Sequence, residues 1–407
     1  MSITEGQRVT LERRGTILVG KRIGVGATAS VYEASVIRTG ERGVFKFFNS
    51  NQGKDYRDPR SRFLIDQQLP QIHPIFCAPT DIVIDGSLCG HFSPLINGKT
   101  LATYLDGPAV DFFECLEICI SLAYALSHLH KLGIGHCDIH PENILLVKTG
   151  SRYRAIVIDF DNYSAPGQKP PTAWGHEHYM APEQRRALIN DDFTPPDCHS
   201  DRFSLAVIIH LLMLFTHPAE GHYEDLNGLH QVMMDGNWHC DPQSGGTRDR
   251  GLPSEMLNTP LRALFRRAFS LEPIERPSAS KWARTLDQAS KEVFIHEHCE
   301  KPSFIDQNTT TCPHCGIPFP ELSLKFPGAG RSLAVRDEPK VVRGAHAICQ
   351  RVGAESFVTN FGRQSLLKNE NGSWKRLTDE QPIVIVPGDK LRFGDAECLV
   401  ELVGGKK

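Results

Sequence analysis

The sequence carries almost no excess charge of either sign. Its 45 lysines and arginines nearly balance 48 aspartates and glutamates, and the formal net charge is −3, so the overall charge favours neither nucleic acid nor an anionic membrane as a partner. Long hydrophobic runs are also lacking: the longest, Phe203–Phe215, is interrupted by His210 and is too short to span a bilayer. The first residues contain no apolar stretch of the kind found in a secretory signal. We therefore expect a cytoplasmic protein that has no nucleic-acid or membrane partner.

No internal repeat and no long low-complexity segment is present, and 407 residues correspond to two to three domains. The 12 cysteines are spread widely, and Cys115 and Cys119 have the spacing of buried thiols on one helix. Only the group near residues 300–315 is spaced like metal ligands. We expect reduced thiols and few or no disulfides.

The composition and periodicity of the sequence change along the chain. Short β-branched and aromatic segments separated by glycine or aspartate run to about residue 97, and a helical period begins at Asp111. Histidine, cysteine and threonine become frequent near residue 293, and short strands recur from Leu322. This predicts a multidomain α+β protein: a β-rich and a helical lobe within 1–292, a small module at 293–320, and an all-β sandwich at 325–407.

A glycine-rich turn and a lysine in an apolar segment stand near the N-terminus. Gly24 and Gly26 would let backbone N–H groups approach phosphate oxygens closely, but such a turn is also typical of a plain hairpin. Lys46 follows in the segment V-F-K-F-F. It is either an edge residue facing water or a point charge directed at phosphates. These residues alone leave both alternatives open.

Five further motifs follow in a fixed order. They are G-H-C-D-I-H-P-E-N-I-L-L at 135–146, I-V-I-D-F-D at 156–161, M-A-P-E at 180–183, S-D-R-F-S-L at 200–205 and E-R-P-S at 275–278. With the glycine turn and Lys46, this order resembles the protein-kinase family over roughly residues 15–290. The resemblance implies a bilobal kinase fold and an ATP- and Mg²⁺-dependent protein serine/threonine kinase. The A-P-E and R-P-S motifs favour a protein substrate over a small molecule.

The resemblance implies a nucleotide site in the first lobe. Lys46 would hold the α- and β-phosphates, the carbonyl of Pro94 and the N–H of Ile96 would bind the adenine edge, and Ser93 is either a gate behind adenine or an ordinary strand residue. The turn and the strand after it would cover the nucleotide with Gly24, Gly26, Ala29 and Val31, where Ala29 stands in place of a third glycine.

The resemblance also assigns the chemistry. Asp138 would orient the acceptor hydroxyl and take its proton, and Asn143 and Asp159 would be the side-chain ligands of Mg²⁺, which prefers hard oxygen donors. Structural roles are implied for two further pairs: His136 and Asp201 would brace the catalytic loop, and Glu183 and Arg276 would form a buried ion pair.

Two departures concern the lysine and the metal. No glutamate occurs between Glu41 and Glu114, so the helix that usually supplies a partner for the strand lysine has none. Asp66 is the best substitute, although it is one methylene shorter. The metal motif reads D-F-D, and Asp161 would add a carboxylate near the metal.

Two departures concern the catalytic loop. Cys137 replaces an arginine that normally meets an activation-loop phosphate, so we expect no requirement for loop phosphorylation. His140 stands where a lysine near the γ-phosphate is usual, and a protonated imidazole would substitute for it. Because no direct phosphate or metal contact is removed, we favour an active enzyme, with a nucleotide-binding pseudokinase scaffold as the alternative.

A metal cluster is expected between the kinase-like region and the tail. The spacing H-x-x-C and C-x-x-C can close a tetrahedron of thiolates and imidazole that favours Zn²⁺. We expect the ligands His296, Cys299, Cys312 and Cys315, with His298 as the alternative to His296. The segment resembles a zinc ribbon with a structural metal. The other interpretation, a redox C-x-x-C, usually requires a βαβ setting.

The tail resembles forkhead-associated domains, which bind phosphothreonine. The resemblance rests on residues 385–395, with looser matches at His346 and Asn360, while Arg343 stands where a serine is usual. The alternative is a β-sandwich used for docking. Kinase, ribbon and tail together resemble bacterial kinases that accompany a von Willebrand A protein and a metal-dependent protein phosphatase, which we expect as partners beside the protein substrate.

Overall fold

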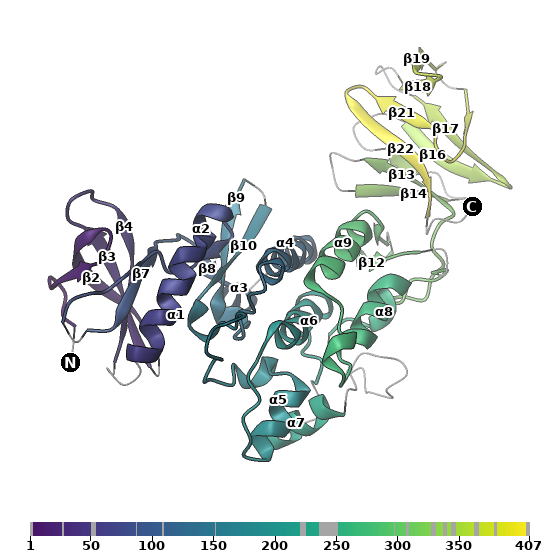
Figure 1. The fold of residues 1–407 in the computed structure, drawn as a ribbon. Coiled ribbons are helices and arrows are strands. Elements are labelled where there is room, and N and C mark those ends of the chain that lie inside the picture. Colours follow the sequence, from purple (N-terminus) through teal and green to yellow (C-terminus); the bar gives the residue numbers. More distant parts are fainter. Residues whose placement is uncertain are drawn as a thin grey trace. The chain divides into compact units, whose positions relative to one another are not determined.

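The computed structural model describes residues 3–26, 28–49, 54–86, 88–107, 110–150, 152–219, 225–235, 251–296, 298–306, 309–326, 331–336, 340–342, 347–361, 366–377 and 381–403. The chain divides into two compact units, Met1–Gly251 with Leu264–Leu286, and Leu252–Ala263 with Asp287–Lys407. The first contains the β-rich and helical lobes expected of a bilobal fold (Figure 1). The second contains the cysteine-rich module and the C-terminal strands.

The first unit begins with an antiparallel sheet and two helices: β1 (Arg8–Leu11), β2 (Gly15–Val25), β3 (Ala29–Val36), β4 (Arg42–Phe48), α1 (Lys54–Gln67), α2 (Leu69–Ile72), β6 (Asp81–Ile82) and β7 (Gly90–Pro94). The strand order is β1-β2-β3-β4-β7-β6. Buried and partly exposed residues alternate along β3 and β4, as the two-residue period of a strand requires when one face is buried. Val19, Phe45 and Phe92 on this face belong to one hydrophobic core.

Helices and a small second sheet follow. Their elements are β5 (Phe76–Cys77), β8 (Lys99–Thr100), α3 (Leu101–Leu105), α4 (Phe112–Lys131), η1 (Pro141–Asn143), β9 (Ile144–Thr149), β10 (Arg152–Ile158), η2 (Phe160–Asn162), η3 (Glu177–Tyr179), α5 (Pro182–Ile189), α6 (Cys198–Leu214), α7 (Leu226–Met234), η4 (Ser254–Met256), α8 (Thr259–Ala268), η5 (Pro273–Glu275) and α9 (Ala279–Ser290). The sheet has the order β5-β10-β9-β8. The catalytic-loop motif lies between α4 and β9, which fixes both of its ends in the core.

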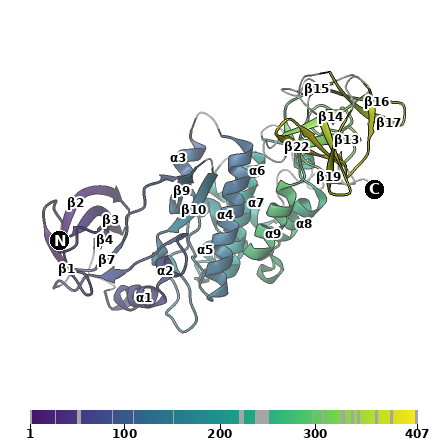
Figure 2. The same cartoon turned by 90° about the horizontal axis from the view of Figure 1, so that it is seen from above.

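The two long helices begin at aspartate caps. The Asp111 side chain accepts hydrogen bonds from the backbone N–H groups of Phe113 and Glu114 at the start of α4. The Asp197 side chain likewise accepts from those of His199 and Ser200 at the start of α6. Both caps satisfy N–H groups that have no partner within the helix. Among the described residues, α4 is the one helix that length and composition would allow to cross a membrane. It packs against β10 and α6 (Figure 2). Most of it is buried, which is usual for the core helix of a globular domain.

A buried ion pair closes the helical lobe. Arg276 donates to both carboxylate oxygens of Glu183, at 2.8 and 2.6 Å, and its side chain is fully buried. The pair is the one that the sequence predicted. Because an unpaired buried charge is costly, loss of either partner would destabilise this lobe strongly.

The second unit includes η4, the start of α8 and the end of α9. Its strands are β11 (Val293–Ile295), β12 (Pro302–Phe304), β13 (Leu322–Phe326), β14 (Arg331–Val335), β15 (Lys340–Val342), β16 (Ala347–Val352), β17 (Glu355–Asn360), β18 (Leu366–Glu370), β19 (Ser373–Arg376), β20 (Ile383–Ile385), β21 (Lys390–Phe393) and β22 (Ala396–Leu402). The sheets have the orders β14-β13-β22-β21-β18-β19 and β15-β16-β17-β20. Leu324 and Val400 of one sheet share a core with Val358 and Ile385 of the other, so the tail is a β-sandwich.

The cysteine-rich module packs on the sandwich rather than standing alone. Phe294 and Phe319 of the module share a small core with Ala334 and Val403 of the sandwich. The sequence-based division between 293–320 and 325–407 therefore separates parts that share buried side chains. Arg343 and His346, two residues on which the forkhead-associated resemblance was judged, lie outside the described residues.

Candidate active site and metal centre

Lys46 lies within the N-terminal sheet, beside the glycine-rich turn. Gly24 of β2 pairs with Val31 of β3, and Val31 pairs with Lys46 of β4. The turn is a hairpin in which the Gly26 N–H donates to the carbonyl oxygen of Ala29 at 2.8 Å. The Lys46 side chain is only 14% exposed. Of the two alternatives for this lysine, the edge residue facing water is therefore wrong.

Two carboxylates hold the Lys46 ammonium group. Its Nζ atom is 2.6 Å from Asp159 Oδ1 and 2.8 Å from Asp161 Oδ2. Asp159 directly follows β10 and has a φ of 62°. Although burial alone would raise it, the charge and hydrogen bond of Lys46 hold the pKa of Asp159 below its ordinary value. Asp159 therefore stays ionised near neutral pH, as a ligand for a divalent cation must.

Asp66 does not replace the missing helix glutamate, and that expectation is wrong. Its Oδ1 atom pairs with Nη2 of Arg13 at 2.9 Å, and both side chains are largely exposed. Asp66 lies in the last turn of α1, where Arg13 is the cation within reach. The second acid beside Lys46 is Asp161 instead.

One buried carboxylate braces the catalytic loop. Asp201 of α6 accepts the N–H groups of His136 and Cys137, each at 2.7 Å, and its Oδ2 is 3.0 Å from His130 Nε2. Cys137 needs this support because its φ is 67°, a region that residues with side chains rarely adopt. His136 Nε2 also lies 2.8 Å from the carbonyl oxygen of Ile158, which ties the loop to β10. These contacts agree with bracing roles for His136 and Asp201.

Asp138 and Asn143 contact each other in the same loop. Asn143 Nδ2 donates to the carbonyl oxygen of Asp138 at 2.9 Å and to its Oδ2 at 3.3 Å, and burial raises the pKa of Asp138. Two residues after β10 that the sequence analysis did not single out, Asn162 and Gly175, lie close to the carbonyl oxygen of Cys137. Asn162 Nδ2 donates to the carbonyl oxygen of Cys137 at 3.0 Å, and Gly175, with a φ of 86°, crosses so closely that a Cβ would lie 3.2 Å from the same oxygen.

His140 does not carry the charge expected of it. Its Nε2 atom is 3.8 Å from Asp138 Oδ1, and its ring centroid is 4.8 Å from that of His176. Burial lowers the pKa of His140 to about 4, so the imidazole is neutral at pH 7. The prediction of a protonated His140 near the γ-phosphate is therefore wrong in its charge. A neutral imidazole retains one N–H donor for a hydrogen bond.

The residues expected at the adenine edge lie at the end of β7. Ser93 pairs with Val44 of β4 and has a buried side chain. The carbonyl oxygen of Pro94 accepts the thiol of Cys77 at 3.3 Å. A carbonyl oxygen has two lone pairs, so an adenine amino group would share it with this thiol. Ile96, two residues further on, is partly buried.

The environment of Cys137 leads to a prediction about loop phosphorylation. Its buried thiol has a raised pKa and is therefore neutral, so it offers no positive charge to a phosphate. Thr172, between Asp159 and Glu183, is exposed. Thr172→Ala should keep turnover within about twofold of wild type, because surface substitutions usually change free energies by less than about 0.5 kcal/mol. Steady-state kinetics measures it. A folded Thr172→Ala protein that binds ATP without turnover would refute this inference.

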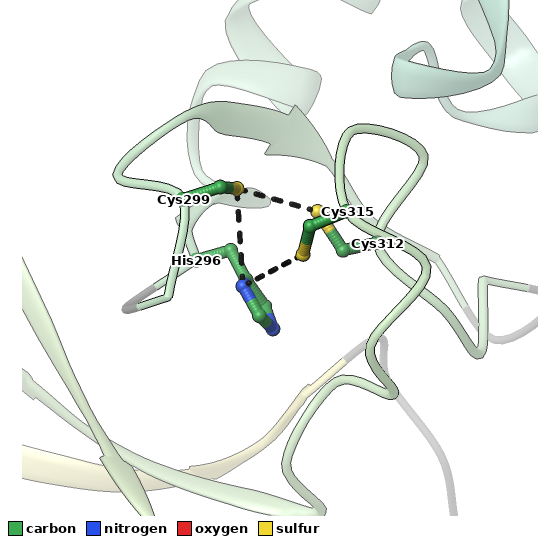
Figure 3. Close-up of side chains that lie close together, drawn as sticks. All are labelled: His296, Cys299, Cys312 and Cys315. Carbon is green, nitrogen blue, oxygen red and sulfur yellow. Dashed lines mark hydrogen bonds between the residues drawn. The ribbon is translucent and has the colours of Figure 1, made fainter.

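A second cluster, in the second unit, contains the four predicted metal ligands (Figure 3). The ligand atoms of His296, Cys299, Cys312 and Cys315 all lie within 4.8 Å of one another. Cys299 Sγ is 3.7 Å from Cys312 Sγ and 3.9 Å from His296 Nδ1, and Cys315 Sγ is 3.5 Å from the same nitrogen. The three cysteines are free thiols. One nitrogen and three sulfurs in this arrangement suit tetrahedral Zn²⁺.

Two tight turns produce the cluster. The Gly316 N–H donates to the carbonyl oxygen of Cys312 at 2.8 Å, and the Glu300 N–H donates to that of His296 at 2.7 Å. Gly316 and Glu300 have positive φ values of 74° and 55°. These tight turns bring Cys312 together with Cys315, and His296 together with Cys299, in the cluster. His298 is exposed, and its ring centroid is 6.4 Å from that of His296. The geometry therefore favours His296 over His298.

The surroundings of the cluster fit a metal better than a redox pair. The described strands on its N-terminal side, β11 and β12, form an antiparallel hairpin rather than a βαβ unit. Zn²⁺ with three thiolates and a neutral imidazole carries a net charge of −1. Arg336 Nη2 lies 3.4 Å from His296 Nε2 and is a suitable neighbouring cation.

The family model described as the protein kinase domain matches residues 17–286. This chain belongs to the protein kinase family. It is 26% identical over 299 residues to the serine/threonine-protein kinase PkaA of Streptomyces coelicolor. The aligned region covers 69% of this chain and 51% of that protein. It is 25% identical over 348 residues to a probable serine/threonine-protein kinase of Corynebacterium efficiens. That alignment covers 80% of this chain and 50% of the relative. The chain spans about half the length of these relatives. The resemblance predicted from the motifs is confirmed.

Proposed function

We propose that this chain is an ATP- and Mg²⁺-dependent protein serine/threonine kinase whose C-terminal region carries a structural Zn²⁺ and serves for docking. The observation that carries the proposal is the presence of two pairs in the first unit, Lys46 with Asp159 and Asp138 with Asn143. Phosphoryl transfer requires a cation for phosphate oxygens, oxygen ligands for a metal, and a carboxylate for the acceptor hydroxyl. The two pairs supply all three.

The donor set suits magnesium. Asp159 contributes an ionised carboxylate and Asn143 an amide oxygen, both hard oxygen ligands. The amide nitrogen of Asn143 is already engaged with Asp138, so its oxygen is the atom left for the metal. When bound, ATP would supply the γ-phosphoryl group, and Mg²⁺ held by Asp159 and Asn143 would offset negative charge on the phosphate oxygens.

The residues of this chain would then position the reactants. The backbone around Gly24 and Gly26 would cover the phosphates, and the Lys46 ammonium would bind their oxygens. The Asp138 carboxylate would accept a hydrogen bond from a serine or threonine hydroxyl and take its proton during transfer. Asp201 accepts two backbone N–H groups of the loop that carries Asp138, and so helps to keep the Asp138 carboxylate in position.

Asp159→Asn tests the nucleotide and metal assignment. The change removes the charge of one hard ligand, so the affinity for ATP in the presence of Mg²⁺ should fall by about tenfold or more, the scale of one charge-assisted contact. Calorimetry with and without Mg²⁺ measures it. Asp66→Asn, which removes an exposed acid whose partner is Arg13, is the matched control and should bind as wild type does. Unchanged metal dependence in Asp159→Asn would move the metal site elsewhere, with Asp161 as the first candidate.

The C-terminal part of the proposal rests on the ligand cluster. A Zn²⁺ ion whose four positions are all occupied by His296 and three cysteines has no open position for a substrate, which is typical of a structural site. Docking to a von Willebrand A protein or a metal-dependent protein phosphatase, and binding of phosphothreonine, remain predictions from the resemblance alone.

A further inference from the structure

The Lys46 ammonium has two acidic partners that lie two residues apart in the chain. Asp159 Oδ1 is 2.6 Å from Nζ and Asp161 Oδ2 is 2.8 Å from it. If Asp159 ligates a metal, as proposed above, its carboxylate is drawn toward the metal and Lys46 depends on its other partner. That partner is Asp161.

The acids on helix α1 whose side chains the structure describes have other partners than this lysine. Of the acids on α1 whose side chains are described, Asp58 accepts the thiol of Cys89 at 3.5 Å and Asp66 pairs with Arg13 at 2.9 Å. The helix carries a buried cation in this region instead. Arg60 is 4% exposed and points toward the segment that follows Asp159.

Arg60 binds the backbone at Asp161 and just after it. Its guanidinium group donates to the carbonyl oxygens of Asp161, at 3.4 Å, and of Tyr163. The guanidinium lies 4.0 Å from the centroid of the Tyr163 ring, and the Tyr163 hydroxyl donates back to the carbonyl oxygen of Arg60 at 3.1 Å. Phe63, one turn further along α1, stacks on the same ring at 5.6 Å. Helix α1 is thus joined to the Asp161 segment through Arg60.

We propose that Asp161 is the positioning residue for Lys46, held in place from α1 by Arg60, and that this arrangement replaces an acid on the helix itself. The inference rests on the proposed function, because it concerns how Lys46 is kept available for phosphate oxygens. Asp161 acts through Lys46 and does not touch the reacting atoms. Without Asp161, Asp159 is the remaining acid that the described residues place beside Lys46, and the lysine and the metal compete for the same carboxylate.

This competition gives a distinct signature for Asp161→Asn. The Mg²⁺ concentration that gives half-maximal binding of ATP should rise by about tenfold, the scale of one charge-assisted hydrogen bond. Binding of ATP without Mg²⁺ should not weaken, since one negative charge beside the phosphates has been removed. Asp161→Glu keeps the carboxylate and should recover most of the Mg²⁺ dependence. Asp66→Asn, the matched control, should behave as wild type.

The competing interpretation is that Asp161 is itself a metal ligand. A double-mutant cycle separates the two. If Asp161 acts through Lys46, Asp161→Asn should have little further effect on the Mg²⁺ dependence in a Lys46→Met background. A metal ligand would keep its full effect there.

The experiment measures binding of a fluorescent ATP analogue to the full chain as Mg²⁺ is titrated, for the single and double variants. An undiminished effect of Asp161→Asn in the Lys46→Met background, or no effect in the wild-type background, overturns the proposal. Binding does not require turnover, so a wild-type protein that binds MgATP but transfers no phosphate refutes the kinase activity alone. Wild-type protein that fails to bind MgATP overturns both.

Discussion

Asp138→Ala is expected to lower phosphotransfer by about 10²–10⁴-fold, the range for loss of a positioned general base. The Asp138 carboxylate is the group proposed to accept the proton of the acceptor hydroxyl. Its loss should leave ATP binding close to wild type, because the proposed phosphate and metal contacts come from Lys46, Asn143 and Asp159. Initial rates with a protein acceptor, together with a nucleotide-binding titration, measure both quantities.

The contact between Asp138 and Asn143 makes a second variant necessary as a control in this experiment. The Asn143 side chain donates to Asp138, so a structural change on removal of the carboxylate would disturb the metal ligand as well. Asp138→Asn keeps the size of the side chain and should lose turnover to a similar extent. Variants that both lose ATP binding would show that the loop has been displaced, and variants that both retain turnover would remove Asp138 from the mechanism.

Removal of zinc is expected to unfold the cysteine-rich module over Glu292–Phe319. The module is too small to hold a core alone, and Cys312 is buried beside Phe294 and Phe319 in its small cluster. The binding free energy of a structural zinc is largely folding free energy, on the order of 10 kcal/mol. Cys312→Ser or a strong chelator should therefore disorder this module, while ATP binding survives because no proposed nucleotide contact lies there.

Elemental analysis and limited proteolysis test this prediction. We expect one zinc per chain and protection of the module that is lost after chelation. Cys198→Ser, which changes a free thiol outside the cluster, is the matched control and should retain the metal and the protection. A metal-free protein with a protease-resistant module would contradict the zinc assignment. A disulfide between Cys312 and Cys315 in protein isolated without exposure to an oxidant would do so as well.

Much of the active site could be predicted because its chemistry fixes residue types in a fixed order along the chain. Lys46, Asp138, Asn143 and Asp159 would each perform a task that few other side chains can perform. The lobes could be predicted because β-branched and aromatic segments between glycine or aspartate mark the strands and a helical period marks α4. The cluster of His296, Cys299, Cys312 and Cys315 could be predicted because the x-x spacing alone places two side chains on one turn.

The rest depended on contacts between distant segments. Asp161 lies 115 residues after Lys46, and Arg60 reaches it from a helix in between, so neither contact leaves a pattern in the sequence. The charge of His140 depends on burial, which spacing does not report. The cysteine-rich module and the sandwich differ in composition, and only the structure shows that they share a core.

The most direct test of the account is phosphoamino-acid analysis after incubation of the wild-type protein with γ-labelled ATP, Mg²⁺ and a protein acceptor. The account predicts labelled phosphoserine or phosphothreonine with the wild type, and none above background with Asp138→Ala. Equal labelling by the two proteins would contradict the catalytic assignment. A wild-type protein that binds MgATP but labels no serine or threonine would contradict the kinase activity and leave the nucleotide-binding scaffold in its place.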